Sequence, residues 1–264
     1  MTLNIPDVFM TCKREQRAAL MPFLTSGYPS DKMFMELIRG MIRAGADMIE
    51  IGVPFSDPLA DGRSIQKSSE MALANGINID RTLRLARMAV DGQTVPLVLM
   101  SYFNPILAFG EKRLLQRMRL SGFRGLIIPD LVPEEGTKME KLCRQYEIDL
   151  IYLLAPTSDH KRRRQIIDRA SGFVYLVSVA GVTGTRKVLP RSLKTWIRQV
   201  KKESTLPVCV GFGISNPRQA REISRDADGV IVGSALVEII EKAPNERRMI
   251  HDVHSFVSQM KTQK

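Results

Sequence analysis

The residues of this chain that could do chemistry are carboxylates. Glu50 stands inside the apolar run 48–53, and Asp57 and Asp61 lie in the polar segment that follows this run. A carboxyl group among apolar side chains is desolvated, so its pKa rises and it can take and give a proton near neutral pH. The competing interpretations are an outward-pointing Glu50 paired with a basic helix residue, and solvated turn aspartates. The pattern favours acid–base chemistry by two carboxyl groups.

Glycines at two further places predict an anion site. Gly211 and Gly213 precede Asn216 and Pro217, a residue pair typical of a helix start, and Gly233-Ser234 also leads directly into a helical pattern. Backbone N–H groups are left free at a helix N-terminus, and glycine allows an anion to approach them closely. The alternative is that these are ordinary turn glycines. Taken together, the two segments indicate a phosphate site.

Other kinds of site find little support in the sequence. The three histidines and the three cysteines (Cys12, Cys143 and Cys209, with no CxxC spacing) suggest no catalytic triad, no metal site and no disulfide framework. We therefore expect a metal-free protein of the reducing cytoplasm. No apolar run approaches the ~20 residues of a membrane span, and the N-terminus lacks a signal-peptide pattern, so we expect no membrane partner.

The charge balance raises a nucleic-acid hypothesis, because 39 Lys and Arg against 28 Asp and Glu give a net charge of +11. The longest basic run, residues 160–164, contains no interleaved aromatic side chains on which bases could stack. We therefore interpret the excess as a surface bias and expect no nucleic-acid partner.

The elements that must position these residues alternate along the chain. Apolar runs rich in Val, Ile and Leu are typical of parallel strands covered on both faces, and amphipathic stretches separate them. The predicted strands are 19–25, 48–53, 97–102, 125–129, 150–154, 173–179, 208–212 and 229–232. The predicted helices are 32–44, 79–91, 111–120, 134–146, 161–170, 193–202, 217–225 and one near the C-terminus marked by apolar residues between 249 and 260.

Eight strands, each followed by a helix and without a linker, predict an α/β fold: one (β/α)8 TIM barrel over residues 1–264 with additional helices. A doubly wound open sheet is the alternative. In a barrel, the active site lies at the C-terminal ends of the strands, where Glu50 and the glycines fall. Residues 180–187 form a polar loop long enough to close as a lid, and we expect residues 55–62 to move as well. The residues alone thus predict an enzyme that uses carboxylates on a small phosphorylated molecule.

The chain resembles the tryptophan synthase alpha subunit family over nearly its whole length. The long segment from Glu50 through PFSDPLADG to Gly62 is the most specific match, because it is not a general feature of barrels. The other matching segments are 22–29, 102–105, 128–131, 180–184, 211–215 and 233–235.

This resemblance implies a lyase that splits indole-3-glycerol phosphate into indole and glyceraldehyde 3-phosphate. Glu50 matches the family's general acid/base, and Asp61 matches the acid that stabilises the charged indole. Asp57 matches a position that faces the partner subunit, and Thr183 resembles the lid residue that closes on Asp61. Residues at the family's indole pocket are Phe23, Met100, Ile127, Phe212 and, nearby, Tyr175. Those at its phosphate site are Gly184, Gly213, Gly233 and Ser234.

The resemblance also implies a partner, the tryptophan synthase beta subunit, in an α2β2 heterotetramer through which indole passes. Pyridoxal phosphate is expected in that partner, and no cofactor in this chain. Two positions depart from the family pattern: Arg63 replaces a usual Pro, and Ser26 stands where Ala is frequent. Arg63 puts the rigidity of its loop in doubt, and its charge is expected to depress the pKa of Asp61.

Three other functions stay open at this point. The chain could be an alpha subunit that mainly activates its partner, another phosphate-binding barrel such as a sugar-phosphate epimerase or isomerase, or a free-standing indole-releasing lyase. An intact pair of Glu50 and Asp61 argues against an alpha subunit that mainly activates its partner. The long segment after the second strand argues against a sugar-phosphate epimerase or isomerase.

Overall fold

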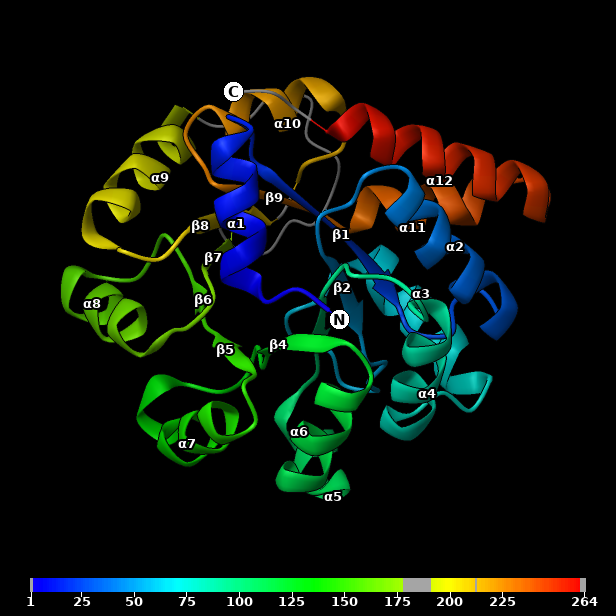
Figure 1. Ribbon diagram of the computed structural model, residues 1–264, viewed down its shortest axis with the longest axis horizontal. Coiled ribbons are helices and arrows are strands. Elements are labelled where there is room, and N and C mark those ends of the chain that lie inside the picture. The colour runs from blue at the N-terminus through cyan, green and yellow to red at the C-terminus, as the bar shows by residue number, and fades with distance from the viewer. Residues whose placement is uncertain (1, 178–190, 212, 262–264) are drawn as a thin grey trace.

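The computed structural model describes residues 2–177, 191–211 and 213–261, and within them nine strands form one sheet (Figure 1). The order is β5-β4-β3-β2-β1-β9-β8-β7-β6, and all neighbouring pairs are parallel. The strands are β1 (Ala19–Thr25), β2 (Ile49–Gly52), β3 (Leu97–Met100), β4 (Phe123–Ile127), β5 (Asp149–Ile151), β6 (Leu153–Leu154), β7 (Val174–Val177), β8 (Val208–Gly211) and β9 (Gly229–Val232).

The two ends of this sheet meet because β5 and β6 are parts of one extended segment, interrupted only at Tyr152. β5 pairs with β4 and β6 pairs with β7, so the nine strands correspond to the eight predicted ones and the barrel closes. The predicted (β/α)8 barrel is confirmed, and the open doubly wound sheet is wrong.

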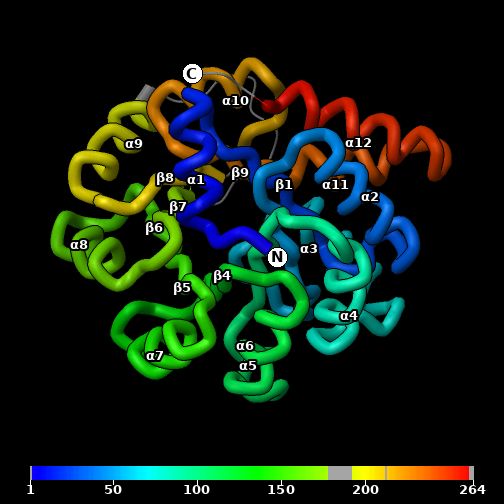
Figure 2. Tube along the Cα trace, viewed as in Figure 1, coloured from blue at the N-terminus to red at the C-terminus, as the bar shows by residue number. Residues whose placement is uncertain are grey.

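Helices surround the barrel, as Figure 2 shows along the Cα trace. They are α1 (Ile5–Arg14), α2 (Asp31–Arg43), α3 (Arg63–Ala74), α4 (Ile79–Ala89), α5 (Phe103–Phe109), α6 (Glu111–Leu120), a 3₁₀ turn η1 (Pro133–Glu135), α7 (Thr137–Gln145), α8 (His160–Arg169), α9 (Arg191–Glu203), α10 (Pro217–Ser224), α11 (Ser234–Lys242) and α12 (Glu246–Met260). Four of these, α1, α3, α5 and α11, have no range among the predicted helices, although a helical pattern after Gly233-Ser234 indicates the start of α11. The predicted helix 134–146 divides into η1 and α7 at Gly136.

The apolar side chains form two cores. The larger core lies between the strands and the helices, and the smaller core lies inside the barrel. Ile5, Phe9 and Cys12 of α1 belong to the inner core together with Met21 and Met48 of the barrel wall. α1 therefore packs into one end of the barrel, where Figures 1 and 2 show it crossing the ring of strands.

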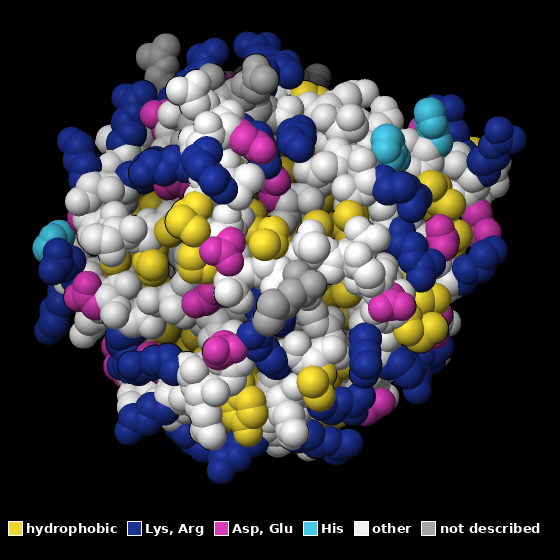
Figure 3. Space-filling view, in the orientation of Figure 1, with side chains coloured by type: hydrophobic (Ala, Val, Ile, Leu, Met, Phe, Trp, Pro, Cys, Tyr) yellow, Lys and Arg dark blue, Asp and Glu magenta, His cyan; other side chains and the backbone are white. Residues whose placement is uncertain are grey.

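The basic excess follows the helix ends. Most helices carry Lys or Arg in the last turn, where a positive charge interacts favourably with the helix dipole. These residues are Lys13, Arg14, Arg43, Arg87, Arg117, Arg119, Arg144, Arg169, Lys201, Lys202, Arg221 and Lys242. On the face shown in Figure 3, Lys and Arg side chains gather around the periphery and hydrophobic ones lie nearer the middle. No helix in the described part of the chain is long and apolar enough to cross a bilayer.

Candidate active site

Glu50 lies inside the barrel. It is the second residue of β2 and is in register with Phe23 of β1 and Val98 of β3. Because side chains alternate along a strand and Val98 belongs to the inner core, this register points Glu50 inward. Its side chain is 1% exposed, and its Oε2 has no hydrogen-bond partner among the described residues. The described residues therefore do not support an outward Glu50 paired with a basic helix residue.

Burial changes the acidity of Glu50. Desolvation raises its pKa to about 8, and the nearby charge of Asp61 acts in the same direction. A carboxyl group in this state is protonated at neutral pH and can both donate and recover a proton, as the sequence predicts.

Asp61 comes to the same end of the barrel on the loop between β2 and α3. Its backbone N–H donates to the carbonyl of Pro58 at 3.3 Å, and Gln66 Nε2 donates to its carbonyl oxygen at 2.9 Å. Burial raises the pKa of its carboxyl group to about 6, and a hydrogen bond from the Tyr102 hydroxyl opposes that rise. Asp61 is thus ionised at neutral pH while Glu50 is protonated.

The expected lowering of the Asp61 pKa by Arg63 is not seen. Arg63 is exposed and begins α3, with Gly62 as the N-cap. The pKa of Asp61 is raised rather than depressed, because burial of the carboxyl group outweighs any effect of a solvated cation two residues away.

Asp57 lies on the outer part of the same loop and is exposed, and Ser56 Oγ donates to its carboxylate at 2.6 Å. Leu59, two residues on, is 94% exposed. The loop therefore divides into an inner end with Asp61 and an outer part with Asp57.

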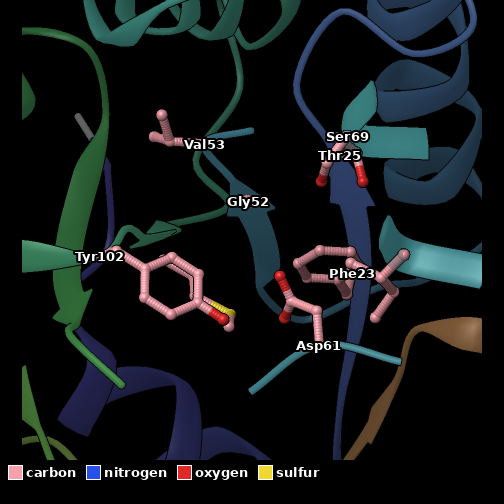
Figure 4. Close-up of a pocket in the computed structure, with 9 residues that line it drawn as sticks. Phe23, Thr25, Gly52, Val53, Asp61, Ser69 and Tyr102 are labelled. Carbon is pink, nitrogen blue, oxygen red and sulfur yellow. The ribbon is translucent and has the colours of Figure 1, made fainter. Parts of the chain in front are cut away.

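A narrow cavity of about 10 Å³, enough for a single water molecule, lies between these elements (Figure 4). Asp61 points into it beside the ring of Phe23, and the ring of Tyr102 extends across it from the other side. Gly52 makes room for Phe23, because a Cβ at this position would come within 2.7 Å of the ring. The lining residues are Phe23, Thr25, Gly52, Val53, Asp61, Ile65, Ser69, Met100 and Tyr102.

The other predicted indole-pocket residues are distributed around this cavity. Ile127 and Tyr175 belong to the inner core and do not line the cavity itself. Burial raises the pKa of Tyr175, and the charge of Glu50 adds to the rise. A Cβ at Gly211 would lie 2.2 Å from the Tyr175 hydroxyl, so Gly211 gives this side chain its space. Phe212 lies outside the described residues.

The predicted phosphate residues stand at two helix starts. Gly213 has φ +70°, a conformation that favours glycine, and leads to α10, whose N-cap Asn216 accepts the N–H of Gln219. Gly233 is the N-cap of α11, Ser234 is its first residue, and no side chain caps this helix. A Cβ at Gly233 would be 3.4 Å from Phe23, so the start of α11 lies against a wall of the cavity. Thr183, Gly184 and the predicted lid 180–187 lie outside the described residues.

Sequence reasoning missed six of the nine cavity residues: Thr25, Gly52, Val53, Ile65, Ser69 and Tyr102. Thr25 Oγ1 and Ser68 Oγ are 2.6 Å apart and buried, which ties the end of β1 to α3. Tyr102 and Thr25 both fall at or just after a strand end, so the barrel rule could have found them. Among the described residues, no group of three or more His, Cys, Asp or Glu could hold a metal ion.

Fold and site together define a (β/α)8-barrel enzyme with one buried carboxyl group, Glu50, inside the barrel and a partly exposed one, Asp61, in the wall of a small cavity. Comparison with known proteins identifies its family: residues 9–264 match the model of the tryptophan synthase alpha chain. The chain belongs to this family and has its function, that of a lyase in tryptophan biosynthesis. The sequence-based assignment is confirmed, and the epimerase or isomerase alternative is wrong.

Named relatives agree over nearly the whole chain. Tryptophan synthase alpha chains of Roseiflexus castenholzii and Carboxydothermus hydrogenoformans are 45% and 46% identical, over 91% and 92% of this chain and 92% and 91% of theirs. The solved alpha subunit of Legionella pneumophila is 34% identical with a TM-score of 0.89, covering 98% of this chain and 97% of its own. A chain of Mycobacterium tuberculosis tryptophan synthase is 33% identical with a TM-score of 0.90, covering 99% and 100%.

Proposed function

We propose that this chain cleaves indole-3-glycerol phosphate into indole and glyceraldehyde 3-phosphate, with Glu50 and Asp61 as its catalytic residues. The observation that carries the proposal is the placement of the two carboxyl groups, Glu50 buried on the inner face of β2 and Asp61 in the wall of the cavity. Burial raises both pKa values, to about 8 for Glu50 and about 6 for Asp61. Two carboxyl groups whose environments separate their pKa values are suited to different roles in one reaction.

The retro-aldol cleavage needs a proton on C3 of the indole and removal of a proton from a glycerol hydroxyl group. In this proposal, protonated Glu50 donates to C3, and the resulting carboxylate accepts the hydroxyl proton as the carbon–carbon bond breaks. Asp61, ionised at neutral pH, accepts a hydrogen bond from the indole N–H and stabilises the positive charge that develops on the ring.

The binding residues are proposed on the same basis. Phe23 and Met100 line the apolar cavity beside Asp61, and Ile127 and Tyr175 extend its apolar surroundings into the inner core. The phosphate would bind the backbone N–H groups at Gly213, Gly233 and Ser234, near the helix starts of α10 and α11. Thr183, Gly184 and Phe212 complete the proposed site on the strength of the family resemblance alone.

We further propose a tryptophan synthase beta subunit as the partner, in an α2β2 complex that carries pyridoxal phosphate in the beta subunit only. The similarity to a chain of M. tuberculosis tryptophan synthase supports this proposal. Asp57 and Leu59 on the outer part of the β2–α3 loop are exposed and available to a partner.

An indole-release assay tests both parts of the proposal. The purified chain is given indole-3-glycerol phosphate, alone and with increasing amounts of beta subunit. We expect slow indole release that accelerates with beta subunit and is lost in Glu50→Gln. No indole under either condition would leave only a role in activating the partner. Full activity that the beta subunit does not change would identify a free-standing lyase.

A further inference from the structure

Tyr102 occupies a fixed position between the barrel and the loop that carries Asp61. It stands two residues after β3, acts as the N-cap of α5 and is 4% exposed. Hydrogen bonds fix the backbone on both sides of Tyr102. Ser101 N–H donates to the carbonyl of Ile127 at 3.0 Å, and Phe103 N–H donates to the Asp130 carboxylate at 2.9 Å. The side chain of Tyr102 therefore projects from a rigid support.

The Tyr102 hydroxyl interacts with two adjacent residues of the β2–α3 loop, Ala60 and Asp61. Its oxygen accepts the backbone N–H of Ala60 at 2.9 Å. Its own proton is then available to the neighbouring carboxylate of Asp61, whose pKa the hydroxyl lowers. In Figure 4 the ring of Tyr102 extends across the pocket toward Asp61.

The ring of Tyr102 also contacts the other end of this loop. The centroids of Tyr102 and Phe55 are 5.1 Å apart, with the rings tilted by 30°. One side chain thus holds the loop at Phe55 and at Ala60–Asp61, while Asp57 and Leu59 between these points are exposed.

We propose that Tyr102 is a positioning residue for the lyase reaction, which fixes Asp61 in the cavity and keeps its carboxylate directed at the substrate. This inference rests on the proposed role of Asp61. A hydrogen bond from a neutral hydroxyl favours the ionised carboxylate, and burial disfavours it. Tyr102 itself stays protonated because burial and the charge of Asp61 raise its pKa. Loss of the hydroxyl would therefore both free the loop and raise the pKa of Asp61.

Tyr102→Phe tests the inference because it keeps the ring contact with Phe55 and removes the interactions of the hydroxyl with Ala60 and Asp61. We expect kcat for indole release to fall about 10- to 100-fold, since a hydrogen bond to a charged group contributes about 1.5–3 kcal/mol. KM should change less than about threefold, because the apolar lining is retained. The acidic limb of the pH profile should move to higher pH. The other titratable groups coupled to Asp61 or Tyr102 in the described residues, Glu50, Tyr175 and Asp130, remain in place.

Tyr152→Phe is the matched control. Tyr152 is 3% exposed and its hydroxyl donates to Glu140 at 2.8 Å, in the core between barrel and helices. This variant loses a buried tyrosine hydroxyl bond but should keep kcat and the pH profile of the unmodified chain. Ala60→Pro, at an exposed position, removes the N–H that bonds Tyr102 without altering the core and should lower kcat in the same direction.

The outcomes separate the inference from the proposed function. If Tyr102→Phe and Ala60→Pro keep kcat within twofold and the acidic limb stays in place while Asp61→Asn is inactive, the positioning role is wrong and the role of Asp61 stands. If Asp61→Asn itself turns over normally, the proposed function is wrong. An equal loss of kcat in Tyr152→Phe would mean that the loss in Tyr102→Phe reflects general destabilisation, and this would overturn the inference.

Discussion

The carboxyl groups of Glu50 and Asp61 interact electrostatically although they come from different elements, Glu50 from the inner face of β2 and Asp61 from the loop after it. The charge of Asp61 adds to desolvation in raising the pKa of Glu50. Such a pair loses its protons in two coupled steps, with pKa values of about 6 for the first and about 8 for the second. Between these values the site holds one proton, and it holds it on Glu50.

Replacement of Glu50 by Gln should abolish indole release while leaving the chain folded and able to bind the beta subunit. The amide fills the same volume but cannot transfer a proton, and general acid–base groups contribute about 10²–10⁴-fold to rate. The measurement is indole release with saturating beta subunit. Glu70→Gln, at an exposed position of α3, is the control and should be fully active. Retention of more than a few per cent of activity by Glu50→Gln would rule out its role.

The pH dependence of kcat/KM should be bell-shaped. Activity should rise through about pH 6 as Asp61 ionises and fall through about pH 8 as Glu50 loses the proton it gives to the indole. Asp61→Asn should be severely impaired, and its residual activity should lack the acidic limb. Its falling limb should move to lower pH, because the charge that helps to raise the pKa of Glu50 is gone. A profile that is flat between pH 5 and 9 would contradict this assignment of protons.

The strands were the most predictable elements because buried parallel strands are continuous apolar runs. β1 and β9 have the predicted bounds, 19–25 and 229–232. α3 was not predictable in this way, since the residues it buries are small: Ser68, Ser69 and Ala72. α1 is absent from the predicted helices although Ile5, Val8, Phe9 and Cys12 have helical spacing, so its signal was present in the sequence.

The candidate site was predictable only in part. The position of Glu50 within an apolar strand is enough to predict a buried carboxyl group with a raised pKa. The raised pKa of Asp61 could not be predicted in this way. The nearest charge in sequence, Arg63, is solvated, and how far Asp61 is shielded from water depends on how the loop folds back. The contacts of Tyr102 with Phe55 and Ala60 join residues over 40 positions apart, and no local pattern encodes them.

Glu50 should also make the free energy of unfolding depend on pH. Its pKa is about 8 in the folded chain against a model value of 4.5, so between these values the folded state holds a proton that the unfolded chain has lost. The contribution of Glu50 therefore lowers stability as pH rises through this window. Urea unfolding of the unmodified chain and of Glu50→Gln at pH 5 and pH 8 measures it. Relative to the unmodified chain, the variant should gain stability at pH 8, and an equal difference at both pH values would contradict the raised pKa.

Gly52→Ala should disturb the indole pocket through Phe23. The added Cβ would lie 2.7 Å from two ring carbons, so the ring must move into the cavity or the strands must separate. Overpacking of this kind destabilises by about 1–3 kcal/mol, and a displaced Phe23 should also raise KM for indole-3-glycerol phosphate more than it lowers kcat. Gly40→Ala in α2 is the control, because a Cβ there meets nothing within 4 Å. That substitution should stabilise the chain by up to about 1 kcal/mol, since alanine is the better helix former, and should leave KM unchanged. If both variants showed the same KM and the same stability, the close packing of Phe23 against Gly52 would not be what shapes this wall of the cavity.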